Sequence, residues 1–266
     1  MTLAGGIIVL CFLAIALLGP ILVTQDPIAQ DLGHRLTGPS REHPFGLDSL
    51  GRDVFSRVIN GTRISVVSGA AVVTVATIFG VAAGMLAGWS GGWWDEALMR
   101  ITDMFLAFPS LVLAMAISAI LRPNLTNALL AIAVTSWPAY ARIARAQVLA
   151  LRARTYIEAA RAQGATDAVI LLRHLIPNAV APILVQSSLD VGNIILTTAG
   201  LSFIGFGAQP PTPEWGLMVS EGRRFLMDQW WISTFPALAI LFLVLGFNLL
   251  GDGVRDLLDP RLRKLA

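Results

Sequence analysis

Two aspartates inside apolar stretches are the first residues of this chain that could carry chemistry. Asp103 stands close to one end of its stretch, whereas Asp190 stands deeper. Ionisable groups in such surroundings are costly and usually functional, and two carboxylates at one depth could act as acid and base in an intramembrane enzyme. The unequal depths argue against that function. For Asp103 we expect a structural pair with Arg100, whereas Asp190 fits either a transport pathway or a pairing between helices.

Known ligand and nucleotide motifs also give no support to an enzyme. The chain has no His-Glu-x-x-His zinc motif and no Gly-x-x-x-x-Gly-Lys-Ser/Thr phosphate loop. His34 and His43 lie near Asp48 and Asp53, but their spacing matches no known ligand pattern. We therefore expect no catalytic residue, no metal site and no cofactor on this chain. If ATP drives its function, a partner must bind the nucleotide.

A polar segment between two apolar stretches, residues 152–176, is the most informative part of the sequence. It contains Glu158-Ala159-Ala160, then Gly164, and Pro177 follows thirteen residues after the glycine. Gly164 predicts a bend between two short helices, and Pro177 is expected in the first turn of the next long helix. We expect two apolar faces, one made by Leu151, Thr155, Ala159 and Ala162 and one by Val169, Leu172 and Leu175. An amphipathic helix–turn–helix between membrane spans predicts a docking site for a partner.

Composition and hydropathy predict an all-α polytopic membrane protein. Hydrophobic residues make up 55% of the 266 residues, and charged residues make up 14%, against about 25% in soluble domains. Runs of about 18 or more apolar residues predict spanning helices. We expect six, at about 3–24, 64–88, 101–121, 126–147, 177–200 and 232–251. The fourth is interrupted by Pro138, Arg142 and Arg145, and the glycines 80, 84 and 88 are expected to pack helices together.

The distribution of arginine and lysine favours a cytoplasmic N-terminus and C-terminus, because the segments then placed inside carry the larger share of these residues. The first apolar run lacks the charged start and the cleavage site of a signal peptide, so we expect a retained anchor. The net charge of +2 is too small for a nucleic-acid surface. We divide the chain into an N-terminal span with its outer loop (1–63), a core (64–252) with an outer, partly inserted hairpin (201–231), and a cytoplasmic tail (253–266).

With these features in view, the chain resembles the inner-membrane permease subunits of ABC importers, most closely the DppC/OppC type that serves dipeptides, oligopeptides and nickel. The family's loop motif is Glu-Ala-Ala, three residues, Gly, and a proline after a short apolar pair, and this chain matches it from Glu158 to Pro177. Further resemblance lies in HPFGLDSLGRDVFSRVINGTRIS (43–65), FPSLVLA (108–114), LSFIGFGAQPPTPEWGLMVSEGR (201–223) and LGDGVRDLLDPRLR (250–263).

This resemblance implies a type I ABC importer fold in the bacterial cytoplasmic membrane. It implies that Glu158, Ala159, Ala160, Gly164 and Pro177 belong to a loop that couples the spans to a cytoplasmic ATPase. The implied partners are a homologous permease, two ATP-binding subunits or one fused ATPase that supply ATP and Mg, and an extracytoplasmic solute-binding protein, all assembled in membrane lipid.

The implied cargo is a di- or oligopeptide, with nickel, glutathione, haem or another small solute as alternatives. One departure bears on the cargo, because Thr198 stands where related subunits often have an acidic residue. We therefore take Asp190 and Thr198 as candidate pathway-lining residues. An ion-driven secondary transporter is a further alternative, but it predicts an inverted second half of the chain, and no such repeat is visible.

Overall fold

The computed structural model describes residues 2–23 and 25–258, and this part of the chain is helical, with one isolated bridge between Leu47 and Asp53 and no strand. The long helices are α1 (Thr2–Leu22), α2 (Val54–Ser90), α5 (Leu125–Arg152), α8 (Ile176–Ile204) and α10 (Trp231–Leu258). Shorter ones are α3 (Gly92–Leu106), α4 (Ser110–Leu121), α6 (Thr155–Ala162), α7 (Asp167–Ile170), the π-turn η1 (Leu171–Leu175), α9 (Trp215–Gly222) and the 3-10 turn η2 (Arg223–Phe225).

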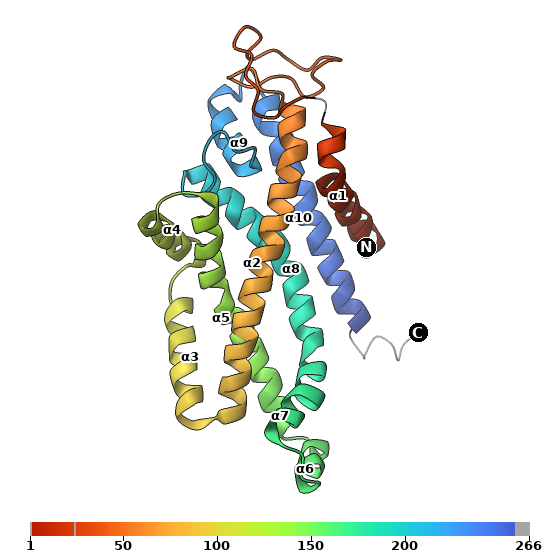
Figure 1. Cartoon of the computed structure of the whole chain (residues 1–266), viewed down its shortest axis with the longest axis vertical. Coiled ribbons are helices and arrows are strands. Elements are labelled where there is room, and N and C mark those ends of the chain that lie inside the picture. The colour runs from red at the N-terminus through yellow and green to blue at the C-terminus, as the bar shows by residue number, and fades with distance from the viewer. Residues whose placement is uncertain (1, 24, 259–266) are drawn as a thin grey trace.

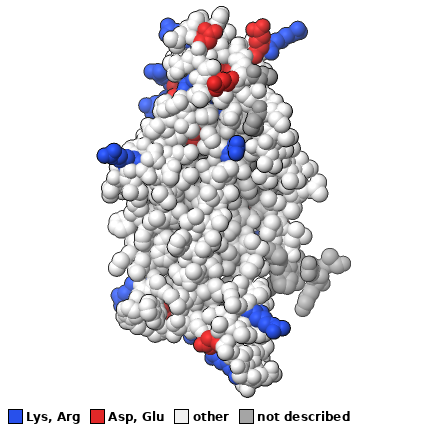
Figure 2. Space-filling view, in the orientation of Figure 1, with Lys and Arg blue, Asp and Glu red and all other residues white. Residues whose placement is uncertain are grey.

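Helices α2, α5 and α8 form the centre of an elongated bundle (Figure 1). α1 and α10 pack together on one side of it, and α3 and α4 lie on the other. α6 and α7 project at one end, whereas the loop 25–53 and α9 lie at the opposite end. Charged side chains gather at these two ends, and the middle of the visible face is almost free of them (Figure 2). This distribution is typical of a protein that crosses a membrane.

Four helical runs, α1, α2, α7–α8 and α10, are long and apolar enough to span a membrane. The predicted span 101–121 is present as a bent pair of helices. The structure breaks it into α3 and α4, which meet at 90° and together could count as a fifth span. Pro109 stands at the break because it has no N–H to continue the hydrogen bonds of α3.

The fourth predicted span, α5, lies inside the bundle but does not meet the same standard of length and hydropathy among the described residues. Arg142 and Arg145 lower the hydropathy of its second half.

The boundaries of two other predicted spans also differ. α2 begins at Val54, well before residue 64, because the Asp53 carboxylate accepts a hydrogen bond from the Ser56 N–H (2.7 Å) and caps the helix. α10 continues to Leu258, and the last eight residues of the predicted tail (259–266) lie outside the described residues.

The glycine stripe on α2 packs against α5, as predicted. A methyl group added at Gly80 would overlap the Trp137 carbonyl oxygen, and one at Gly84 would overlap the Ala141 carbonyl oxygen. At Gly88 it would lie 2.9 Å from the Val148 Cβ. The two helix backbones can approach this closely only because these positions have no side chain.

We expect the substitution Gly84→Ala to separate α2 from α5 and to destabilise the protein by about 1–3 kcal/mol, the usual cost of overpacking. The matched control is Gly6→Ala in α1, where an added methyl group has no neighbour within 4 Å. The thermal unfolding midpoint of the detergent-solubilised protein, followed by tryptophan fluorescence, measures both. Equal midpoints for the two variants would contradict the assignment of this stripe.

Candidate functional site

The predicted bend at Gly164 is present. α6 ends at Ala162, and Gly164 has a φ of 85°, in the left-handed region that favours glycine. Its N–H donates to the Arg161 carbonyl (2.9 Å), and the Ala165 N–H donates to the Ala160 carbonyl (3.0 Å). Because a Cβ at Gly164 would have nothing within 4 Å, the backbone conformation, and not crowding, explains the glycine.

Pro177 lies in the first turn of α8, also as predicted. The structure adds a feature that the sequence did not reveal, since residues Leu171–Leu175 before it form a π-turn. A proline ring collides with the carbonyl four residues earlier in an α-helix, and the wider π-turn relieves this crowding. The Ile176 N–H donates to the Leu171 carbonyl, and the Asn178 side-chain amide donates to the His174 carbonyl (2.6 Å). The helical run therefore continues from α7 through η1 into α8, held by hydrogen bonds despite the missing proline N–H.

The buried face of this segment differs from the predicted one. Ile157, Ile170 and Leu175 are fully buried and form one cluster with Val148 of α5. Of the residues predicted to make the apolar faces, Thr155, Ala159, Ala162, Val169 and Leu172 are exposed. Helices of eight and four residues are too short for spacing alone to choose a face. The ends of α2 and α5 decide which face of the segment is buried, since Met85, Trp89 and Leu151 pack around the cluster.

The exposed side of α6, α7 and η1 carries apolar residues at the end of the molecule. Leu172 is 67% exposed, and Val169 and Tyr156 are each more than 40% exposed. Glu158 is exposed and forms no ion pair with any residue in the described part of the chain. We call the exposed residues Tyr156, Glu158, Ala159, Val169 and Leu172 the tip surface. The Tyr156 ring lies beside the His174 ring, with centroids 6.2 Å apart, whereas Val169 and Leu172 leave apolar surface exposed, which is typical of a docking surface.

Two ion pairs join α3 to α5 near the same end. Arg142 binds Asp103 (2.6 Å), and Arg145 binds both carboxylate oxygens of Asp95 (2.5 and 2.7 Å). The predicted pair between Asp103 and Arg100 is therefore wrong, because Arg100 binds Glu96 one turn earlier instead. The arginine from α5 reaches Asp103 because α3 packs beside α5, a neighbour that the sequence spacing within α3 does not show.

The two candidate pathway residues differ in their surroundings. Asp190, at the middle of α8, is half-buried and accepts a hydrogen bond from the Gln186 side chain (3.0 Å). Thr198, two turns further along, is buried, and its hydroxyl has no hydrogen-bond partner within the described structure. The structure therefore places Asp190 at the edge of an open helix face and Thr198 in the interior of this chain.

A buried ionic cluster at the opposite end was missed by sequence reasoning. Arg52 and Arg57 are both 1% exposed; Arg52 binds Asp48 (2.6 Å), and both arginines reach the Glu221 carboxylate (2.8 and 3.4 Å). This cluster ties the loop 25–53 to the end of α9. Glu214 caps the start of α9, where its carboxylate accepts hydrogen bonds from the Gly216 and Leu217 N–H groups (3.0 and 2.8 Å).

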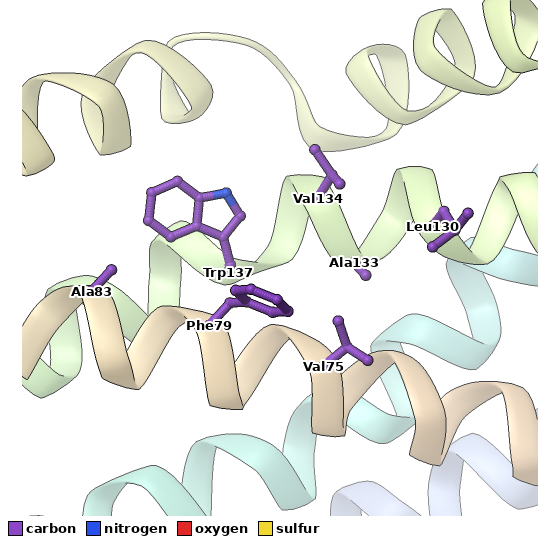
Figure 3. Close-up of a pocket in the computed structure, with 7 residues that line it drawn as sticks. All are labelled: Val75, Phe79, Ala83, Leu130, Ala133, Val134 and Trp137. Carbon is purple, nitrogen blue, oxygen red and sulfur yellow. The ribbon is translucent and has the colours of Figure 1, made fainter.

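Three further features of the described structure, an apolar groove, a serine motif and the arrangement of metal-ligating side chains, offer no reaction chemistry. A groove of about 440 Å³ between α2 and α5 is lined by apolar residues, among them Val75, Phe79 and Trp137 (Figure 3). The string Gly88-Trp89-Ser90-Gly91-Gly92 matches Gly-x-Ser-x-Gly, but Ser90 ends helix α2 and does not stand at the strand-to-helix turn of a hydrolase nucleophile. The residues that the structure describes contain no group of three or more metal-ligating side chains.

Residues 80–264 match the family of binding-protein-dependent transport system inner membrane components. The chain belongs to this family. The match includes the bend at Gly164, the π-turn and all of α8, so the tip surface lies within the family's common region.

Several curated permeases match this chain over almost its whole length. The dipeptide transport system permease protein DppC of Alkalihalophilus pseudofirmus is 46% identical over 99% of this chain and 86% of its own length. The probable D,D-dipeptide transport system permease protein DdpC of Escherichia coli is 48% identical over 98% and 88%. The glutathione transport system permease protein GsiD of Pectobacterium atrosepticum is 47% identical over 98% and 87%.

Solved structures of ABC transporters share the fold of this chain at low sequence identity. A chain of the MetNI methionine ABC transporter in an inward-facing conformation aligns with a TM-score of 0.54 and 18% identity, over 74% of this chain and 95% of that one. A chain of an amino acid ABC transporter with histidines aligns with a TM-score of 0.58 and 19% identity, over 77% and 95%. The fold is that of a type I ABC importer permease, and the chain is a multi-pass membrane protein.

We expect the substitution Glu221→Gln to weaken the attachment of the loop 25–53, because it leaves buried Arg52 and Arg57 without one of their counter-charges. Breaking a buried pair costs about 3–5 kcal/mol, and the partial exposure of Glu221 places the expected loss near the lower figure. Limited proteolysis of the loop and the unfolding midpoint measure the effect. Glu96→Gln, which removes an exposed pair, is the control and should leave both unchanged. Equal behaviour of the two variants would refute a structural role for the cluster.

Proposed function

We propose that this chain is the transmembrane subunit of an ATP-driven importer that moves di- or oligopeptides across the bacterial cytoplasmic membrane. The observation that carries the proposal is the tip surface, an exposed apolar and charged face on a helical projection from a membrane bundle of the permease family. A transport subunit of this kind hydrolyses nothing itself. ATP and Mg are bound by its partners.

The tip surface is the proposed docking site for the ATPase. Glu158 provides an unpaired charge, exposed Ala159 and half-buried Ala160 allow a close approach of another backbone, and Gly164 and Pro177 set the angles of α6 and α8. The buried cluster around Ile157 joins α6 and α7 to the ends of α2 and α5. A force on the tip surface would therefore reach α2 and α5 through packed side chains.

This function requires the α6–α7 end to face the cytoplasm. The start of α1 packs against the end of α10, where Thr2 touches Gly253, so the two described ends lie on one side of the membrane. The arginine bias supports a cytoplasmic position of both termini and of the tip surface. The loop 25–53 and the hairpin around α9 would then face the extracytoplasmic binding protein. The proposed units are residues 1–63, 64–252 and 253–266.

The assembly that we propose contains a homologous permease, two ATP-binding subunits or one fused ATPase, and a solute-binding protein. Permeases for a dipeptide, a D,D-dipeptide and glutathione are similar to this chain over nearly its whole length, which supports a peptide-like cargo. Glutathione is the nearest alternative, since it too has an ammonium group, amide bonds and carboxylates.

Asp190 is the residue that we propose for the translocation pathway. It is half-buried at the middle of α8, and a charge there faces water or protein and not lipid. Thr198 could line the pathway only if α8 rotates or shifts during transport, because it is buried in this conformation.

Replacing Gly164 with valine should uncouple ATP hydrolysis from import. A β-branched residue at a φ of 85° is strained and would change the angle of α6. We expect import of a labelled dipeptide into proteoliposomes containing the complete importer to fall at least tenfold, while the basal ATPase rate stays within twofold. Gly164→Asn is the matched control, since asparagine tolerates this backbone conformation, and it should retain most of the import. Wild-type import by Gly164→Val would disprove the coupling role.

A further inference from the structure

A polar cluster occupies the centre of the bundle, where α2, α5 and α8 meet. The Thr77 hydroxyl on α2 lies 3.2 Å from the Ser187 hydroxyl on α8, and the Gln186 side chain donates to the Asp190 carboxylate (3.0 Å). The phenol of Tyr140 on α5 lies beside Asp190, Thr77 and Ser187. We call these five residues the central polar cluster.

Tyr140 gives the cluster an unused hydrogen-bonding group. Its side chain is fully buried, and its ring packs against Ala76, Ala179 and Ile183. The hydroxyl oxygen has no partner of acceptable hydrogen-bond geometry among the described residues. A buried polar atom without a well-formed hydrogen bond is costly, so this hydroxyl, with Asp190, Thr77 and Ser187 beside it, can turn toward a donor that enters the cluster.

The charge of the cluster is also uncompensated. Asp95, Asp103 and Glu221 each bind an arginine, and buried Glu214 accepts hydrogen bonds from two backbone N–H groups at the start of α9. Asp190 has no lysine, arginine or histidine within ion-pair distance in the described part of the chain. A lone carboxylate at this depth needs a positive charge from outside the subunit.

An open helix face leads from the cluster toward the α9 end. Gln186 and Asp190 are half-buried, and Asn193 and Leu196 beyond them are exposed. Further along, a groove of about 410 Å³ between α8, α9 and α10 is lined by apolar residues, among them Gly200, Phe203 and Ile204. Asp190 is therefore accessible along the exposed face of α8, whereas the buried Tyr140 hydroxyl, like that of Thr198, becomes accessible only when the helices shift during transport.

We propose that the central polar cluster binds the ammonium group of a peptide substrate during its passage. This inference rests on the proposed function and specifies which chemical group of the substrate is recognised. An ammonium group has three N–H donors and one positive charge. The Asp190 carboxylate, the Tyr140 hydroxyl and the Ser187 or Thr77 hydroxyl provide three acceptors with one negative charge. A divalent metal ion is a poorer match, because the cluster holds a single carboxylate.

The test uses the complete importer in proteoliposomes, with dialanine and increasing concentrations of binding protein up to saturation, in potassium buffer without sodium. Asp190→Asn should lower the maximal import rate at least tenfold, and Asp190→Glu should retain at least a third of it. The concentration of loaded binding protein that gives half-maximal import should not change, because docking occurs at the far end. The rates are expressed per assembled complex, because a merely structural defect would lower the amount of that complex and not the rate of each one. Asp252→Asn, an exposed carboxylate near the end of α10, is the control and should import normally.

Tyr140→Phe provides a second variant that preserves the packed ring. It should lower the maximal rate about threefold with unchanged assembly of the complex. Dialanine import by both Asp190→Asn and Tyr140→Phe at the wild-type rate would overturn the ammonium site and leave the proposed function intact. If the wild-type complex imports dialanine only when sodium is present, the cluster would be assigned to a metal cation. That result would also overturn the ammonium site. A wild-type complex that imports no dialanine would refute the proposed peptide function itself.

Discussion

The close approach of α2 and α5 is the contact on which the rest of this structure depends. Backbone touches backbone at Gly80 and Gly84, so the two helices behave as one unit. Apolar side chains gain little from association in lipid, and tight van der Waals packing between small residues supplies much of what holds membrane helices together. The pair forms one wall of the central polar cluster and the base of the tip surface.

A stiff connection between two ends is what a coupled transporter requires. Ile157, Ile170 and Leu175 are fully buried against Val148 at the end of α5, so the tip cannot move without α5. At the opposite end, Arg52 and Glu221 join the loop 25–53 to α9. Protein interiors are dense and barely compressible, so displacement at one end is expected to pass through the bundle as movement of whole helices.

Most charged side chains in and next to the bundle are paired, because an unpaired charge in these surroundings is costly. Arginines from α5 neutralise the carboxylates of α3, and Arg52 and Arg57 share Asp48 and Glu221. Asp190 departs from this arrangement in the described structure, and it does so beside a buried hydroxyl that has no partner. A transport site differs from a structural ion pair in this respect, because its counter-charge must arrive and leave with the cargo.

The sequence by itself determined the local features, because their causes are local. A glycine permits the left-handed conformation at residue 164, a proline favours the first turn at residue 177, and long apolar runs must lie in the membrane. It also determined the family, through motifs spread over the whole chain. Tertiary structure alone decided which partner each side chain meets. Asp103 binds Arg142 and not Arg100, Ile157 and not Ala159 faces inward, and Tyr140 lies beside Asp190, because these contacts join helices far apart in the chain. Spacing along one helix carries no information about which neighbour packs against it.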